Sequence, residues 1–209
     1  MQANQIPDEA PHRALRADAR RSRERIIQSA WHMLARSGAQ RFEMDELARD
    51  AEVSKGTLYR HFPNREAVLD AVVEEGALRI VAAMHQRIEP EDDAPSKLRT
   101  FVAILYEFYE REDINLELML AIRGIPRNAA PPEAEPFAEI PKRVRNILEQ
   151  GIREGSFRPL DVPYMTLVVM SLTNPLAVAR QQRRLQYGTD QLQELAVDTI
   201  LHALGSDHP

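Results

Sequence analysis

The sequence predicts an all-α fold of about nine helices, and three observations support this prediction. Apolar residues recur at three- and four-residue spacing along most of the chain, as they do on one face of an amphipathic helix. No stretch shows the sustained alternation of a half-buried strand. The chain has 209 residues, 44% of them apolar and 28% charged, which is enough for a buried core in one two-part domain or two small domains.

The N-terminal part is predicted to begin with an arm and a helix. Residues 1–19 are polar and contain Pro7 and Pro11, so we expect a flexible basic arm there. From Arg20 onward, apolar residues at helical spacing predict a helix that Gly38 ends. Two short helices are then expected within residues 42–62.

The rest of the chain adds the remaining helices, and Pro175 should kink or break one of them. The stretch 124–136 carries four prolines and is predicted to be a loop. A helix is predicted at about 64–89, with Asn64 as its cap and Pro90 at its end, and another begins at Asp93. A buried segment follows at 115–122, and a later helix runs to about Glu154, where Gly155 ends it. Two long helices are predicted at about 162–186 and 189–204.

The net charge of −5 conceals an uneven distribution along the chain. Residues 1–65 hold 12 Lys and Arg against 9 Asp and Glu, whereas residues 66–209 hold 15 against 23. The N-terminal part is therefore the one suited to phosphates, and the acidic remainder favours solubility.

Composition also excludes several kinds of site. The absence of cysteine excludes disulfides, thiolate metal sites and a cysteine nucleophile. The N-terminal residues lack the apolar segment of a signal peptide, and no run approaches the roughly 18 apolar residues of a membrane span. We therefore expect a soluble, cytoplasmic protein that does not enter a membrane.

Residues 43–62 have the pattern of a helix-turn-helix, in which a support helix positions a second helix against base edges. Residues 44–50 form the predicted support helix, and a tight turn follows in which Val53 is expected to be buried. Ser54 is a favourable N-cap for the second helix. In that helix Leu58 and Phe62 face inward, which leaves these residues outward: Lys55, Gly56, Thr57, Tyr59, Arg60 and His61. This basic, aromatic and acid-free face suits phosphates and base edges.

Gly56 is unfavourable in a helix by about 1 kcal/mol relative to alanine. Two explanations are equally open: the missing side chain lets the backbone approach the floor of a DNA groove, or glycine is simply tolerated near the start of a helix.

Residues 20–70 resemble the DNA-binding domain of the TetR family of bacterial regulators. The residues that carry the resemblance are Arg25-Ile-Ile, Ala30, Gly38, Met44-Asp-Glu-Leu-Ala48, Ala51, Val53-Ser-Lys-Gly-Thr-Leu-Tyr59, His61-Phe62 and Arg65-Glu66. The chain departs from the family at Glu52, where glycine is usual, and at Glu43, where a threonine often contacts phosphate. Arg65 replaces the usual lysine and keeps its charge.

The resemblance implies a DNA-binding domain at 20–66, with its helix-turn-helix at 43–62, and a helical ligand-binding and dimerisation domain at 67–209. It implies a regulator, commonly a repressor, that binds a palindromic operator as a dimer and associates with the nucleoid when bound. The implied DNA contacts are Ser54, Lys55, Gly56, Thr57, Tyr59, His61 and Arg65, with Arg60 equally open to solvation alone. For the arm arginines Arg13, Arg16, Arg20 and Arg21, a loose tail and a minor-groove contact are alternatives.

The resemblance also implies a homodimer formed by the two C-terminal helices, at about 162–186 and 189–204, and a pocket for a small, largely apolar effector. No cofactor, metal or catalytic residue is predicted. The apolar candidates could equally be ordinary core residues, and the polar candidates Arg123 and Asn174 could equally be exposed. The candidate lining of the pocket is Met84, Phe101, Leu105, Phe108, Leu116, Leu120, Arg123, Met165, Val169 and Asn174.

The sequence disfavours two other classes of protein. An enzyme is disfavoured because no phosphate loop, nucleophile elbow or His-Glu-x-x-His signature is present. The pair His85 and Glu89, followed by Asp92 and Asp93, has the spacing of a metal site but fits a solvated helix end better. A helical scaffold protein is disfavoured because it has no need of the acid-free polar face at residues 54–65.

Overall fold

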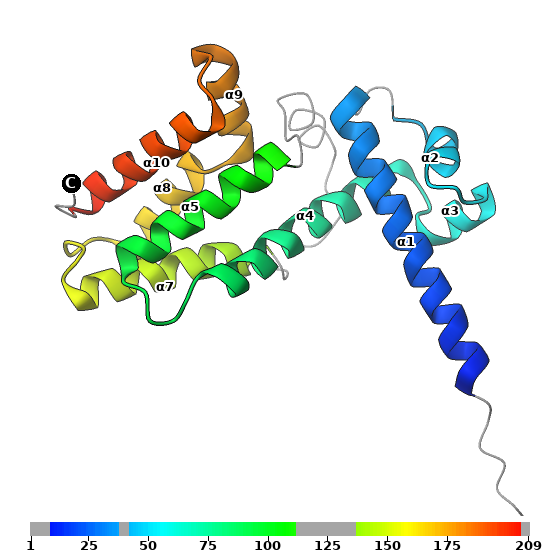
Figure 1. Ribbon diagram of the computed structural model, residues 1–209, viewed down its shortest axis with the longest axis horizontal. Helices are drawn as coiled ribbons and strands as arrows, with labels where there is room; N and C mark the ends of the chain where they lie inside the picture. The colour runs from blue at the N-terminus through cyan, green and yellow to red at the C-terminus, as the bar shows by residue number, and fades with distance from the viewer. Residues whose placement is uncertain (1–8, 38–41, 112–136, 206–209) are drawn as a thin grey trace, which may run out of the picture. The chain divides into compact units, whose positions relative to one another are not determined.

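A computed structural model of the chain describes residues 9–37, 42–111 and 137–205, and these ranges contain α-helices and no strand (Figure 1). The all-α prediction is therefore confirmed. The chain divides into two compact units, Met1–Val72 and Val73–Pro209, so the boundary falls within α4 (Arg65–Arg87). Each unit has its own core.

The first unit is built from α1 (Glu9–Ser37), α2 (Met44–Asp50), α3 (Lys55–His61) and the start of α4. Helix α1 packs against both α2 and α3, which pack against each other. Among the described residues of this unit the buried ones are apolar, and those with no accessible surface are Ile26, Ala30, Leu34, Leu47, Leu58, Val68 and Val72. The two short helices therefore lie where the sequence predicts them.

Helix α1 begins at Glu9, earlier than the predicted start at Arg20, so most of the predicted flexible arm is helical. Two physical reasons account for the difference. Pro11 is the third residue of the helix, where the backbone amide has no acceptor within the helix and proline is tolerated. The residues after it are mainly alanine, leucine and arginine, which have high helix propensity without any apolar periodicity.

The second unit packs α5 (Ala94–Arg111) against α7 (Glu139–Glu154) and against α10 (Thr189–Leu204), and α7 packs in turn on α8 (Val162–Leu172). Helix α5 is the centre of this unit and is buried along most of its length, with Phe101, Val102 and Tyr106 fully inaccessible. The predicted segment 115–122 and the loop 124–136 lie outside the described residues.

The predicted long helix 162–186 is two helices, because Pro175 breaks it. Helix α8 ends at Leu172, and α9 (Pro175–Leu185) begins at the proline with a bend of 47° between the two. Proline has no amide hydrogen and cannot continue α8, but its fixed φ suits the first position of a new helix. The side-chain oxygen of Asn174 caps α9 by accepting hydrogen bonds from the amides of Leu176 and Ala177.

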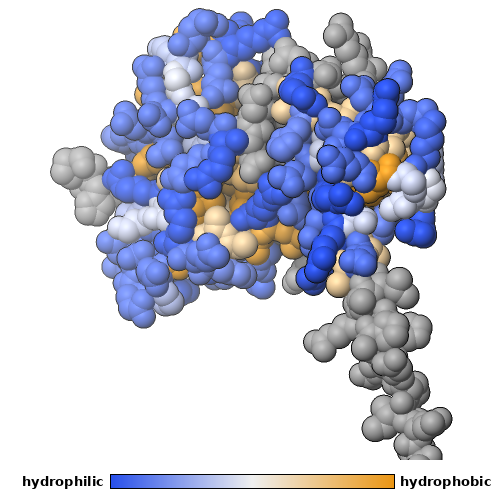
Figure 2. Space-filling model, turned by 45° about the vertical axis from the view of Figure 1, so that its right-hand side comes forward, coloured by the Kyte–Doolittle hydropathy of each residue, from blue (hydrophilic) through white to orange (hydrophobic). Residues whose placement is uncertain are grey.

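Several helix ends follow from local chemistry as predicted. Asn64 Oδ1 accepts a hydrogen bond from the Ala67 amide at 2.8 Å, which caps α4. Gly155 ends α7 in the left-handed region at φ 75°. Within the described residues no single helix is long and apolar enough to cross a bilayer, and only the bent pair α8 and α9 reaches the required length and composition together. Side chains on the face shown in Figure 2 are mostly hydrophilic, with apolar areas between them.

Candidate nucleic-acid interface

The turn between α2 and α3 is closed by backbone hydrogen bonds. The amide of Val53 donates to the carbonyl of Ala48 at 3.0 Å, and the amide of Glu52 donates to that of Arg49 at 3.1 Å. This geometry places Glu52 at φ 53°, in the left-handed region. An L-residue with a side chain is disfavoured there, and glycine is not. Val53 is half-buried rather than buried as predicted, because the turn lies at the surface of the unit.

Ser54 is the N-cap of α3, as the sequence predicts. Its Oγ accepts a hydrogen bond from the Thr57 amide at 3.0 Å and donates to Thr57 Oγ1 at 2.9 Å. The cap satisfies one of the free amides at the start of the helix. It also fixes the Thr57 hydroxyl, so this side chain lies half-buried beside Ser54.

Helix α3 has one face in the core and one in solvent. Leu58 is inaccessible and Phe62 is 3% exposed, so the predicted inward pair is confirmed. Lys55, Gly56 and Arg60 are exposed, and Tyr59 leaves 48% of its side chain in solvent. The exposed face of α3 contains no acidic residue.

Gly56 has open space around it. A Cβ added to this glycine would meet only Ser54 Oγ, at 3.9 Å, which is an ordinary contact. The fold of the protein therefore gives no steric reason for glycine at this position.

The ammonium group of Lys55 is held by a carboxylate from the support helix. Lys55 Nζ lies 2.6 Å from Asp45 Oδ2, and both side chains are more than half exposed. Residues ten apart in the chain meet because α2 and α3 pack against each other. Glu43, the N-cap of α2, lies two residues before Asp45 in the chain. Its side chain is exposed and makes no capping hydrogen bond.

Two arginines from outside α3 border its C-terminal end. The guanidinium of Arg23, on α1, lies 5.6 Å from the ring centroid of Phe62, and that of Arg65 lies 6.0 Å from the ring of Phe42. Sequence reasoning did not single out Arg23, because its proximity to α3 depends on how α1 packs.

His61 is half-buried at the end of α3, and its Nε2 is buried with no hydrogen-bond partner among the described residues. Burial lowers the pKa of His61, and the positive charges of Arg60 and Arg23 lower it further. The imidazole is therefore neutral at neutral pH and adds no positive charge to this surface.

The predicted ligand-pocket residues are mostly core residues. Met84, Phe101, Leu105, Met165 and Val169 are buried, Phe108 is half-buried, and Asn174 is an exposed helix cap. Leu116, Leu120 and Arg123 lie outside the described residues.

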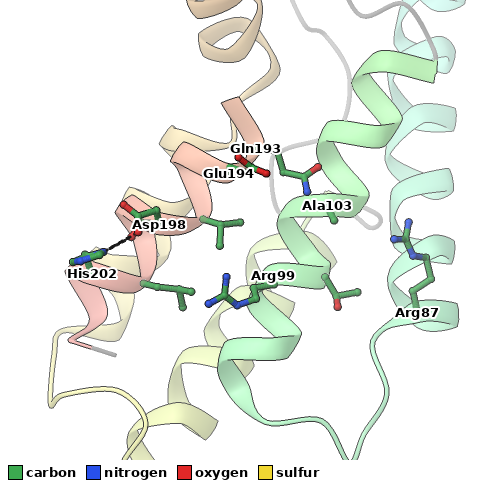
Figure 3. Close-up of a pocket in the computed structure, with 10 residues that line it drawn as sticks. Arg87, Arg99, Ala103, Gln193, Glu194, Asp198 and His202 are labelled. Carbon is green, nitrogen blue, oxygen red and sulfur yellow. Dashed lines mark hydrogen bonds and ion pairs between the residues drawn. The ribbon is translucent and has the colours of Figure 1, made fainter. Parts of the chain in front are cut away.

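A different cavity, of about 410 Å³, opens between α5 and α10 in the second unit. Figure 3 shows Arg99 of α5 in this space, opposite Asp198 and His202 of α10. Three of its ionisable side chains are already paired: Arg87 bonds Glu107 through both terminal nitrogens at 2.6 and 2.9 Å, and His202 Nδ1 lies 3.1 Å from Asp198 Oδ1. The lining carries both charges, unlike the apolar pocket predicted, and none of the predicted pocket residues contributes to it.

Tyr106 is a buried polar residue that sequence reasoning missed. Its side chain is inaccessible, and its hydroxyl has no hydrogen-bond partner among the described residues. Burial raises the pKa of Tyr106 to about 12, so the hydroxyl stays protonated. Within residues 9–37, 42–111 and 137–205, no group of three His, Asp or Glu side chains is placed to hold a metal ion.

Residues 26–72 match the family model for bacterial regulatory proteins of the tetR family. The nucleoid occlusion factor SlmA of Vibrio vulnificus is 28% identical over 143 residues, which are 66% of this chain and 73% of that protein. Two solved structures share the fold. A bacterial regulatory protein in the tetR family from Rhodococcus RHA1 has a TM-score of 0.70 at 23% identity, with 90% of this chain and 98% of that chain covered. The transcriptional regulator FadR of Bacillus subtilis, in complex with stearoyl-CoA, has a TM-score of 0.68 at 19% identity, with 88% and 99% covered.

Proposed function

We propose that this chain, whose residues 26–72 match the model for bacterial regulatory proteins of the tetR family, is a repressor of that family that binds a palindromic operator as a homodimer and is released by a small, largely apolar effector. Its class is that of a DNA-binding transcriptional regulator and not of an enzyme. The observation that carries the proposal is the exposed, acid-free face of α3, which begins at the Ser54 cap.

The proposed contacts divide by chemistry. Lys55 and Gly56 lie at the start of α3, where a recognition helix meets base edges. The hydroxyl groups of Ser54, Thr57 and Tyr59 are suited to phosphate oxygens, and so are the cationic groups of Arg60 and Arg65. His61 would donate through Nδ1, because its Nε2 is buried. A single helix-turn-helix binds weakly, so two copies about one helical turn apart on DNA are expected.

Exposed apolar side chains on the last helices support the dimer. Tyr164 and Leu167 of α8 are 66% and 67% exposed, and Leu195 of α10 is 47% exposed. Large apolar side chains in such positions favour burial against a partner. We expect wild type to sediment as a dimer and Leu167→Glu/Leu195→Glu to sediment as a folded monomer with much weaker operator binding; a dimeric double variant would contradict this interface.

The effector proposal rests on the core of the second unit. Tyr106 offers a buried hydroxyl among apolar side chains of α5, as a site for a mainly apolar ligand requires. The regulator FadR of the same fold is in complex with stearoyl-CoA, a molecule with a long apolar chain. A ligand that shifts operator affinity typically does so through about 1–3 kcal/mol of coupling.

The decisive experiment is a fluorescence anisotropy titration against DNA flanking the protein's own gene, at two salt concentrations. We expect tight, salt-sensitive binding to one palindromic segment by wild type. The variant Lys55→Ala/Tyr59→Ala should stay folded and dimeric and lose about 1–3 kcal/mol for each base contact removed. Equal binding of wild type and variant to that segment would refute the assigned surface.

A second candidate function is suggested by the curated relative, which is a nucleoid occlusion factor. A protein of that kind would occupy sites across the chromosome, whereas a local repressor occupies few. Chromatin immunoprecipitation separates them: peaks confined to a few promoters support the repressor, and many dispersed peaks outside promoters support nucleoid occlusion.

A further inference from the structure

The cavity between α5 and α10, the α5–α10 cleft, lies wholly in the second unit (Figure 3). Its most buried lining residues are apolar: Val197 and Leu201 of α10 are 8% and 4% exposed, and Ala103 of α5 is half-buried. The volume of about 410 Å³ falls within the range of about 300–1,000 Å³ that small-molecule sites occupy. An apolar floor with a few polar groups around it is the usual composition of such a site.

Four polar side chains of the α5–α10 cleft have no hydrogen-bond or ion-pair partner among the described residues: Arg99, Thr100, Gln193 and Glu194. A threonine hydroxyl inside a helix commonly donates to the carbonyl one turn earlier. Thr166 of α8 does so, to the Val162 carbonyl at 2.8 Å, whereas the half-buried Thr100 does not. These groups are therefore available to a bound molecule.

The pairing of the other charged lining residues leaves one cation and one anion without a partner among the described residues. Arg87 is bonded through both terminal nitrogens to a glutamate of α5, and His202 Nδ1 lies 3.1 Å from Asp198 Oδ1. Arg99 and Glu194 remain. A ligand with only negative charge would meet Glu194 uncompensated, and one with only positive charge would meet Arg99. The cleft is therefore complementary to a molecule that carries one charge of each sign.

The distance between these two charges sets the length of that molecule. Arg99 lies opposite Asp198 and His202 across the cleft (Figure 3). Glu194 precedes these two residues by one and two turns of α10, so it is offset from Arg99 by about 6–12 Å along the cleft at 1.5 Å per residue. The two charges of a single amino acid are attached to one Cα atom and cannot reach both groups. An extended tripeptide spans about 10 Å, at about 3.3–3.6 Å per residue, and can reach both.

We propose that the α5–α10 cleft binds a short peptide of about three residues with free termini, its carboxylate on Arg99 and its ammonium group on Glu194. The Thr100 hydroxyl lines the cleft beside Arg99 and can donate a second hydrogen bond to the carboxylate. The Gln193 amide can pair with a peptide group of the ligand, and the middle side chain packs on the apolar floor. This site goes beyond the proposed function and does not rest on it, because all its residues belong to the second unit and none is a proposed DNA contact.

The test is isothermal titration calorimetry of the full chain with the tripeptide Ala-Leu-Ala and its end-blocked forms. Wild type should bind one Ala-Leu-Ala per protomer in a saturable manner. N-acetylation removes the ammonium group and C-terminal amidation removes the carboxylate. Each single block should weaken binding about threefold to fivefold, as the loss of one exposed ionic contact does, and the doubly blocked peptide should bind most weakly.

Two charge variants assign the ends of the peptide. Arg99→Gln should weaken binding of the free and the acetylated peptide about threefold to fivefold and leave the amidated peptide unaffected. Glu194→Gln should weaken binding of the free and the amidated peptide and leave the acetylated one unaffected. Arg145→Gln and Glu149→Gln are the matched controls, because they remove the same charges from exposed positions of α7 outside the cleft. Both controls should bind Ala-Leu-Ala as wild type does, with helicity checked by circular dichroism.

A steric variant tests the cavity independently of charge. Ala103→Leu places a larger side chain on the floor of the cleft and keeps a residue that favours the helix, so it should abolish binding while the protein stays folded. The proposal would be overturned if wild type showed no saturable binding of Ala-Leu-Ala, or if it bound the free and the doubly blocked peptide equally. Equal losses in Arg99→Gln and Arg145→Gln, or full binding by a folded Ala103→Leu protein, would overturn it as well.

Discussion

Lys55 Nζ and Asp45 Oδ2 lie 2.6 Å apart, so the cation at the start of the recognition helix is neutralised by the support helix in the free protein. The pair is well exposed on both sides, with 66% and 54% of the side chains accessible. Exposed pairs contribute about 0–1 kcal/mol and are screened by salt. DNA can therefore compete for Lys55, but it must first displace Asp45.

Removal of the carboxylate should strengthen DNA binding. Asp45→Asn frees Lys55 and eliminates repulsion between Asp45 and phosphate, so affinity for operator and for mixed-sequence DNA should both rise. Glu46→Gln is the matched control, because Glu46 is an exposed acid on the same helix. Equal gains for both variants would show that only net charge matters.

Gly56→Ala should separate stability from binding. The added methyl group meets only Ser54 Oγ at 3.9 Å, and alanine favours the helix, so the free energy of unfolding should rise by up to about 1 kcal/mol. If glycine permits close approach to the groove, operator affinity should fall in the same variant. Chemical denaturation and anisotropy on one protein preparation measure both. Unchanged operator affinity would mean that glycine is merely tolerated.

Features set by a few neighbouring residues were predictable from the sequence. The Ser54 and Asn64 caps, the inward pair Leu58 and Phe62, and the stop at Gly155 each depend on backbone chemistry within one or two helical turns. The break at Pro175 has the same origin, and the sequence predicted it as a kink or a break.

Features set by packing between distant elements were not predictable. The start of α1 was missed because its first residues favour a helix without any apolar pattern to mark it. The Lys55–Asp45 pair depends on the packing of α3 on α2, and the contact of Arg23 with Phe62 depends on that of α1. The spacing of apolar residues also could not distinguish residues that line a pocket from residues of the core. Phe101, for example, was a candidate pocket residue and is completely buried.

Glu52 carries a backbone penalty that a single substitution should relieve. At φ 53° a residue with a Cβ is disfavoured by about 1–2 kcal/mol relative to glycine. Glu52→Gly should therefore raise the free energy of unfolding by roughly 1 kcal/mol, less the greater chain entropy of glycine in the unfolded state. Glu52→Ala removes the same charge but keeps the Cβ, and it should not stabilise the protein. Thermal denaturation of wild type, Glu52→Gly and Glu52→Ala tests this prediction. Equal unfolding midpoints for the three proteins would exclude backbone strain at Glu52.

The lowered pKa of His61 predicts a pH dependence. Between its folded pKa and the ordinary value of 6.5, the unfolded chain binds a proton that the folded protein does not. Stability should therefore fall as the pH is lowered through 6.5, and His61→Gln should show a smaller fall. A nearby phosphate favours the charged imidazole, so operator binding by wild type, unlike the variant, should strengthen on acidification. Parallel pH profiles for the two proteins would show that His61 does not titrate in either process.

Tyr106 and Tyr109 occupy neighbouring turns of α5 but differ in hydrogen bonding, and their rings are 6.1 Å apart. Tyr109 donates its hydroxyl to the Thr173 carbonyl at 2.7 Å, whereas the Tyr106 hydroxyl has no partner among the described residues. Tyr109→Phe leaves a buried carbonyl without its donor and should destabilise the protein by about 1–3 kcal/mol.

Tyr106→Phe removes an unsatisfied buried group and should be neutral or stabilising by about 1 kcal/mol. The two single variants remove the same atom from the same helix, so each serves as the control for the other in urea denaturation. A loss of stability in Tyr106→Phe as large as that in Tyr109→Phe would mean that the Tyr106 hydroxyl is satisfied in solution, for instance by a buried water molecule. In that case the Tyr106 hydroxyl would already be hydrogen-bonded to water, and it would no longer support an effector site at this position.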